Sequence, residues 1–248
     1  DPELLTGVDA VVHLAGEPID GYWWTTKKRQ RIRDSRVLGT ANLVNGLVAM
    51  KRKPDVLISV TGISYYGNRG DECLREDSRA GSGFLAGIAE DWEAATRPAE
   101  DAGIRVVIPR LAPVLSTYSP FVMRLRLPVT LGLGAWFGSG RQYWPWIGLE
   151  DVVGVCRFAL SEKRVRGPVI AAAPQVPACR TLIKTMGAIL GRPVLWGVPA
   201  PLLRLLLGDI ARDMLLSSQR VYPHALLTAG YEFGCPDLDR VLRDALGK

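Results

Sequence analysis

Short apolar runs alternate with longer segments of helical periodicity along the first half of this chain. The runs at 8–13, 56–60 and 105–111 are rich in Val, Ile and Leu, and turn residues bound them. Such runs are typical of buried strands. Between the first two, 34–50 carries apolar residues close to a 3.6-residue period, and 84–102 is a second helical segment ended by Gly103. Strands separated by crossover helices predict an α/β fold with a doubly wound parallel sheet.

The pattern changes after Pro120. It predicts a short helix, a glycine-rich turn, an aromatic strand at 141–146 and a helix that begins near Glu150. A strand at 168–172 and a helix at 181–190 follow. The remainder, 193–248, predicts a strand, a leucine-rich helix and a final short helix, and we interpret it as a smaller lid on the sheet.

Small residues follow two of the predicted strands. Leu14, Ala15 and Gly16 follow the first strand, and Thr61 and Gly62 follow the second. Ligands of open parallel sheets bind beyond the carboxyl ends of strands, where small residues let a flat or phosphorylated group approach the backbone. These positions therefore mark one binding edge.

Composition excludes several classes of protein. Hydrophobic residues make up 48% and charged residues 23% of the 248 positions, the balance of a soluble globular protein. No apolar run approaches the ~18 residues of a spanning helix, so we expect no membrane partner. Four dispersed cysteines without a CxxC pair, and only two histidines, favour a reduced compartment without a metal site. We expect a cytoplasmic location, or an organellar matrix if a leader precedes this sequence.

The formal net charge is +6, and its densest cluster lies at 27–33 beside Trp23 and Trp24. A solvated helix face is the preferred interpretation of this basic run. Contact with phosphate or nucleic acid is the minor alternative.

Five motifs carry a resemblance to a known family. They are HLAGEPI, RIRDSRVLGT, SVTGISYYG, LGLGAWFGSGRQYWPWI and LLLGDIARDMLLSSQRVYPHALLTAGYEF. Together they resemble the epimerase-like group of atypical short-chain dehydrogenases/reductases, in the branch with a small C-terminal domain of unknown function. The similarity extends from Val8 to about Leu246. It implies an NAD(P)-binding Rossmann-like domain at 1–190, with a substrate-side segment at 120–160, and a small, mostly helical C-terminal domain at 191–248.

Measured against that family, the chain lacks the first strand, the glycine-rich phosphate turn and the ribose-reading segment, about 50 residues in all. Those residues would hold the pyrophosphate on a helix N-terminus. We therefore expect an N-terminally truncated fragment that binds dinucleotide weakly or not at all. The family implies NADP, with NAD as the alternative.

The resemblance also implies a path for the cofactor. Leu14, Ala15 and Gly16 correspond to the strand end beside the adenosine, and Thr61 and Gly62 to the strand end under the nicotinamide. Arg36 stands where related enzymes carry Asn, and it could reach a phosphate or order the loop. The segment that borders the nicotinamide ring is Leu111, Ala112, Pro113 and Val114. The alternative is that all of these residues only pack a buried sheet.

The usual catalytic pair of the family is missing. Short-chain reductases transfer a proton with a Tyr whose pKa is lowered by a Lys one helical turn later, whereas this chain has Phe84 and Ile88 there. Thr61, Ser64, Tyr65 and Tyr66 remain near the expected site, and Thr61 matches the position of the substrate-holding hydroxyl. Tyr66 is the remaining candidate for an acid or substrate-orienting group, and its alternative is a packed side chain with a satisfied hydroxyl.

The aromatic segment 141–146 resembles the substrate side of extended enzymes. Arg141, Trp144 and Trp146 are the candidate substrate-binding residues, because rigid rings beside a guanidinium suit a planar or anionic ligand. Burial of both indoles against the C-terminal domain is the competing interpretation.

Two functional hypotheses follow. The first is an NAD(P)-dependent oxidoreductase or epimerase-like enzyme that acts on an unidentified small substrate. The second is a catalytically silent protein that binds dinucleotide or a protein partner, as the loss of the Tyr and Lys positions suggests. The helices that flank the sheet could form the seam of a homodimer, by analogy with related enzymes.

Overall fold

A parallel sheet organises the structure. The computed structural model describes residues 7–19, 21 and 23–248. Its strands run in the order β1 (Ala10–His13), β2 (Val56–Ser59) and β5 (Arg105–Leu111), with β9 (Gly167–Ala171) on the far edge of β5. The short β3 (Thr61–Gly62) pairs with the second half of β5, so β2 and β3 form one interrupted strand. All of these pairs are parallel, as predicted.

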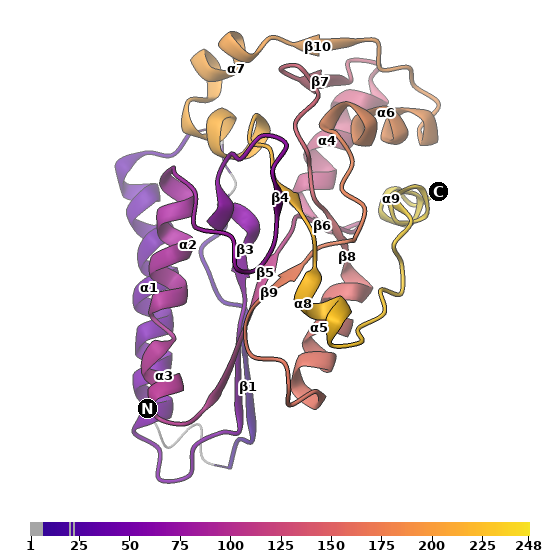
Figure 1. The fold of residues 1–248 in the computed structure, drawn as a ribbon. Coiled ribbons are helices and arrows are strands. Elements are labelled where there is room, and N and C mark those ends of the chain that lie inside the picture. Colours follow the sequence, from indigo (N-terminus) through magenta and orange to yellow (C-terminus); the bar gives the residue numbers. More distant parts are fainter. Residues whose placement is uncertain (1–6, 20, 22) are drawn as a thin grey trace.

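Helices cover both faces of the sheet (Figure 1). On one side lie α1 (Thr26–Val48), α2 (Phe84–Ala94) and α3 (Arg97–Asp101), and on the other lie α5 (Leu149–Ser161) and α8 (His224–Thr228). Buried residues of α1 and α3 pack on β2 and β5 in one core, and α5 and α8 pack on the opposite face in a second core. This is the doubly wound, Rossmann-like α/β fold that the sequence predicts.

The helix α1 begins eight residues before the predicted start. The hydroxyl of Thr25 accepts a hydrogen bond from the backbone N–H of Lys28 and caps the helix. The basic run at 27–33 therefore belongs to α1, and several of its side chains form ion pairs there. These pairs join Lys28 and Arg31 to Glu17, Arg29 to Asp209, and Arg33 to Asp91.

Two other predicted elements differ from the structure. The segment 84–102 forms two helices rather than one, because Pro98 occupies the first turn of α3 and lacks the N–H that a continuous helix needs. The segment 141–146 forms no strand. Instead, β7 (Ala135–Phe137) lies upstream, and Tyr143 makes only an isolated bridge to Ala178.

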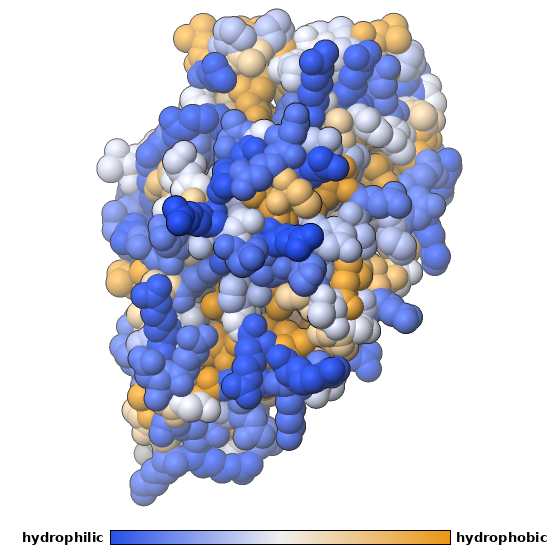
Figure 2. Space-filling view, in the orientation of Figure 1, coloured by the Kyte–Doolittle hydropathy of each residue, from blue (hydrophilic) through white to orange (hydrophobic). Residues whose placement is uncertain are grey.

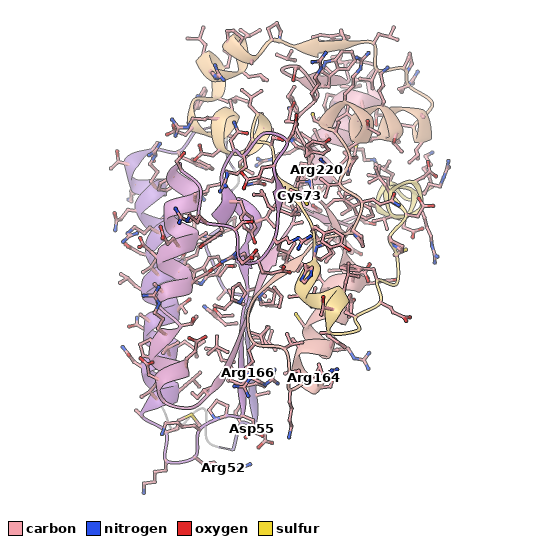
Figure 3. The ribbon with its side chains drawn as sticks, viewed as in Figure 1. Arg52, Asp55, Cys73, Arg164, Arg166 and Arg220 are labelled. Carbon is pink, nitrogen blue, oxygen red and sulfur yellow. The ribbon has the colours of Figure 1, made fainter. Side chains whose placement is uncertain are left out.

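The C-terminal segment is tied to the sheet domain by strand pairs. β10 (Trp196–Val198) pairs with β7, and β11 (Arg220–Val221) pairs with β4 (Cys73–Leu74). Figure 3 shows Cys73 and Arg220 close together where β4 and β11 meet. The remaining elements are β6 (Val114–Leu115), α4 (Pro120–Thr130), β8 (Ile147–Gly148), α6 (Cys179–Ile189), α7 (Ala200–Leu207) and α9 (Leu238–Leu246). Helix α9 packs on α4 and α6 (Figure 1).

Two further features are the apolar length of the helices and the state of the cysteines. Among the described residues, no helix is long and apolar enough to cross a bilayer. All four cysteines are free thiols, and burial raises the pKa of Cys179 to about 12.

A buried ion pair joins the sheet to α2. Arg110, in β5, is only 2% exposed and donates through Nε and Nη2 to both carboxylate oxygens of Glu93, each at 2.8 Å. Its Nη1 donates to the hydroxyl of Tyr66 at 2.7 Å and to the carbonyl of Glu76 at 3.0 Å. The guanidinium carbon lies 3.5 Å from the ring centroid of Tyr65. Four separate segments thus meet at one cation.

We predict that Glu93→Gln lowers the free energy of unfolding by about 3 kcal/mol, because it leaves the Arg110 charge buried without its partner. The matched control is Asp91→Asn on the same helix, whose ion pair with Arg33 is exposed and should contribute less than about 1 kcal/mol. Urea denaturation measures both changes. Equal effects of the two substitutions would contradict the assigned role of Glu93.

Candidate functional site

A polar pocket of about 480 Å³ lies where the C-terminal segment meets the N-terminus of α2. Its walls come from three segments: the turn after β3, the loop that leads into α2, and residues 212–217. The lining residues are Ser64, Gly67, Asn68, Ser82, Gly83, Leu85, Ala86, Arg212, Asp213 and Ser217. Figure 3 shows the labelled Arg52, Asp55, Arg164 and Arg166 at the other end of the sheet, so the pocket belongs to the carboxyl ends of the strands.

The floor of the pocket contains Ser64, in the 3-10 turn η2 (Ile63–Tyr66) directly after β3. A Cβ atom at Gly62 would lie 3.3 Å from the hydroxyl of Ser64, so a glycine at 62 gives that hydroxyl its space. Thr61 is only 3% exposed and its hydroxyl donates to Glu93 at 3.2 Å. Of these two hydroxyls, Ser64 is the one that lines the pocket.

Asp213 caps α2 from a distant part of the chain. Its carboxylate accepts hydrogen bonds from the backbone N–H groups of Phe84, at 3.0 Å, and Leu85, at 3.4 Å. Gly83, with φ 120°, brings the chain so close that a Cβ would lie 3.2 Å from this carboxylate. Arg212 pairs with Asp213 at 2.9 Å and with Asp209 at 2.7 Å. The positive end of the α2 dipole is therefore already matched by an internal anion.

Ser217 is held in the wall of the pocket by its neighbours. The backbone N–H of Ser218 donates to Asn68 at 3.0 Å, and the amide of Gln219 donates to the carbonyl of Ile63 at 3.2 Å. Ser217 is 4% exposed, and its hydroxyl has no hydrogen-bond partner among the described residues. This oxygen is also inaccessible to solvent, so its unsatisfied hydrogen bond is a cost to the folded structure.

The predicted cofactor edge lies open. Leu14, Ala15 and Gly16 are exposed after β1, with Leu14 at 63%. The guanidinium of Arg36 lies against Gly16 and donates to the carbonyls of Glu17, at 2.8 Å, and Ile32, at 3.2 Å. Burial lowers the pKa of Arg36 from its usual value. These contacts favour the loop-ordering alternative for Arg36 over direct contact with a phosphate.

The segment after β5 presents a mixed surface. Pro113 is exposed, Leu111 and Val114 are half-buried, and Ala112 is buried. The backbone of Ala112 is fixed by a hydrogen bond to the carbonyl of Ala171 in β9. This segment therefore offers apolar side chains on a fixed backbone, as a planar ring requires.

The structure buries Tyr66 completely. Its hydroxyl accepts from Arg110, and burial raises its pKa above the usual value despite that neighbouring cation. A group without solvent access and with a raised pKa is a poor proton donor or base at neutral pH. This environment favours the structural alternative for Tyr66 over the predicted acid.

Phe84 and Ile88, which stand at the positions of the usual Tyr and Lys, also have mainly apolar surroundings. The ring of Phe84 packs 5.4 Å from that of Trp24, centroid to centroid, and the guanidinium of Arg29 lies 4.6 Å from its centroid. Ile88 is buried in the same cluster. Neither side chain can transfer a proton.

The predicted substrate residues do not gather in one place. Arg141 is exposed, but Trp144 and Trp146 are 6% and 1% exposed in the core that α4, α6 and α9 share. Trp146 donates to the carbonyl of Gln175 at 3.2 Å, and Trp144 packs between Phe121 and Phe137. Burial, the competing interpretation of the two indoles, is what the structure shows.

Five polar pocket residues were not among the sequence candidates. They are Asn68, Ser82, Arg212, Asp213 and Ser217. No local pattern marks them, because 129 positions separate Asp213 from Phe84 in the sequence. The described residues contain no cluster of three or more His, Cys, Asp or Glu able to hold a metal ion.

Comparison with known proteins shows the family of this chain. The model of the NAD dependent epimerase/dehydratase family matches residues 3–171, and that of a domain of unknown function, DUF1731, matches residues 198–245. The chain belongs to the NAD dependent epimerase/dehydratase family. An epimerase family protein of Mycobacterium bovis is 40% identical over 233 residues, which are 94% of this chain and 77% of the relative.

Two solved structures are similar over nearly the whole chain. The human epimerase family protein SDR39U1, crystallised with NADPH, superposes with a TM-score of 0.91 at 30% identity, over 99% of this chain and 85% of that one. A nucleoside-diphosphate sugar epimerase from Corynebacterium glutamicum gives 0.81 at 31% identity, over 100% and 48%. The sequence-based family assignment and fold class are thereby confirmed.

We predict that Asp213→Ala frees the first turn of α2 and lowers the free energy of unfolding by about 1 kcal/mol, because it removes a helix cap. Amide hydrogen exchange should accelerate at Phe84 and Leu85 while the last turn of α2 keeps its protection. Unchanged exchange at these two amides would contradict the capping role.

Proposed function

We propose that this chain carries the substrate pocket and part of the cofactor edge of an NAD(P)-dependent oxidoreductase or epimerase-like enzyme that acts on a small carbonyl or sugar-like substrate. The observation that carries the proposal is the pocket at the carboxyl ends of the strands, in which Ser64 lies in the turn directly after β3 and residues 212–217 form the opposite side. Open parallel sheets bind ligands at this edge.

The fit of a dinucleotide to the described residues supports the proposal. The exposed backbone at 14–16 suits the adenosine portion, and Gly62 with the segment 111–114 suits the nicotinamide ring. When bound, the cofactor would supply the hydride. The NADPH of the human relative makes NADP the preferred cofactor, with NAD as the alternative.

In this proposal the residues of the chain orient the substrate. Ser64 would donate a hydrogen bond to a substrate oxygen, and solvent would supply the proton, because Phe84 and Ile88 cannot. Thr61 and Tyr66 would act on the substrate only indirectly. Both contact the Arg110–Glu93 pair, which fixes the position of η2 and therefore of Ser64.

A silent dinucleotide-binding or partner-binding protein is the second candidate. The apolar surroundings of Phe84 and the burial of Tyr66 favour it, since no side chain with a suitable pKa faces the pocket from these positions. The two candidates differ in whether bound NADPH is ever consumed.

Calorimetric titration of NADPH and NADH tests the first candidate, with this chain and with a form extended at its N-terminus by the corresponding residues of a longer relative. We expect micromolar binding by the extended form, in which a glycine-rich turn would hold the pyrophosphate, and weak or no binding by this chain. Absence of binding by both forms would contradict the cofactor assignment. Micromolar binding by this chain would contradict the expected dependence on the extension.

For the extended form, we predict NADPH oxidation with at least one substrate in a panel of small aldehydes, ketones and quinones. Ser64→Ala should lower kcat by about tenfold to a hundredfold without weakening NADPH binding, because it removes one donor to the substrate oxygen. Ser161→Ala, at the distant end of α5, is the control. NADPH binding without turnover across the panel would favour the silent candidate.

A further inference from the structure

An apolar patch lies at the end of the molecule that carries α7 and β10. It consists of Leu133, Leu195, Trp196, Leu202, Leu205 and Leu206, all exposed. Leu195 and Leu205 are 77% and 82% exposed, close to fully solvated side chains. Leu202, Leu205 and Leu206 stand at positions i, i+3 and i+4 of α7, so they share one face of the helix.

Strand pairing continues this patch beyond α7. Trp196 of β10 pairs with Ala135 of β7, which brings Leu195 beside the turn that contains Leu133. Figure 1 shows α7, β10 and β7 along the same end of the structure. In Figure 2, hydrophobic residues gather at this end, over α7, with strongly hydrophilic side chains beside them.

A tryptophan adjoins the patch. Trp23 is 69% exposed, and its indole N–H donates to the carbonyl of Leu206 at 2.7 Å. The indole is therefore held at the last turn of α7 with most of its ring in solvent. Tryptophan prefers the boundary between water and hydrocarbon, where its ring and its N–H meet different surroundings.

The two sequence segments that carry the leucines of the patch have charges of one sign. Residues 172–208 contain Arg180, Lys184, Arg192 and Arg204 and no Asp or Glu. Residues 111–149, which include α4 and β7, likewise contain only basic charges. A shallow depression beside the patch is lined by Lys184, Arg192 and Leu195, among others.

The first acidic residue after α7 does not offset this positive charge. Asp209 lies two residues beyond the end of α7, and it is ion-paired with Arg29 and Arg212. Cations and leucines thus share one end of the molecule. Surfaces that combine exposed apolar side chains with clustered Lys and Arg bind anionic bilayers, because burial and charge attraction add.

We propose that this end of the molecule binds the surface of an anionic phospholipid bilayer, with α7 lying in the interface and its Leu202, Leu205 and Leu206 face toward the acyl chains. The charge favours this partner over a second copy of the chain. An isologous dimer through the patch would place the same cations against one another, which is unfavourable. The proposal is independent of the function proposed for the pocket.

Vesicle flotation tests the proposal with the 248-residue chain. We expect it to float with phosphatidylcholine vesicles that contain about 30% phosphatidylglycerol, and to bind pure phosphatidylcholine at least about tenfold more weakly, because several cations lie near the patch. High salt should reduce binding to the anionic vesicles. Equal binding to the two vesicle types, or binding to neither, would overturn the proposal.

Matched substitutions separate the two contributions. Leu205→Ser should weaken binding to anionic vesicles by about tenfold or more, since one leucine is no longer buried. Leu38→Ser, on the exposed side of α1, should leave binding unchanged. Lys184→Gln should weaken binding by roughly fivefold, about 1 kcal/mol, whereas Lys163→Gln should not. If light scattering instead shows a dimer that Leu205→Ser dissociates, and no vesicle binding occurs, a second copy covers the patch and the proposal is wrong.

Discussion

The ion pair between Arg110 and Glu93 is the interaction on which the site geometry depends. Arg110 lies near the carboxyl end of β5, and Glu93 lies near the end of α2, so their two parallel hydrogen bonds fix the helix against the sheet. The same cation holds the hydroxyl of Tyr66, and the same carboxylate accepts from Thr61. Thr61 precedes η2 and Tyr66 ends it, so hydrogen bonds hold the turn on both sides of Ser64. Ser64 therefore has a defined position in the lining of the pocket.

The electrostatics of the pocket follow from Asp213. A helix N-terminus ordinarily attracts an anionic ligand, but here the amides of Phe84 and Leu85 already donate to an internal carboxylate. Arg212 also lines the pocket, but its charge is paired with Asp209 and Asp213. The groups left to a ligand are therefore hydroxyl and amide groups, such as those of Ser64 and Asn68, and they suit a neutral oxygen-bearing substrate of the proposed carbonyl or sugar-like class.

The sequence predicts those parts of the fold that depend on local pattern. The bounds of β5 follow from the mainly apolar run 105–111, whose residues 106–110 are all buried. The early start of α1 escapes prediction because ion pairs stabilise a basic turn that has no apolar periodicity. The pocket is not predicted for a different reason. Asp213 and the two residues after Ser217 make hydrogen bonds across more than a hundred positions, and no local sequence pattern indicates such contacts. Tyr66 shows another limit of prediction from sequence. Its residue type suits catalysis, but the sequence does not show that this side chain is buried against Arg110.

The segment that follows α7 connects the two surfaces of interest. Gly208, with φ 54°, ends α7, and Asp209 and Arg212 then link this segment to α1 and to Asp213. Five residues, 208–212, thus lie between the end of α7 and Asp213, which caps α2. Asp209 pairs with Arg29 of α1, and Asp213 accepts from the first amides of α2, so the segment is attached to both helices. The pocket wall and the apolar patch are for this reason parts of one structural unit.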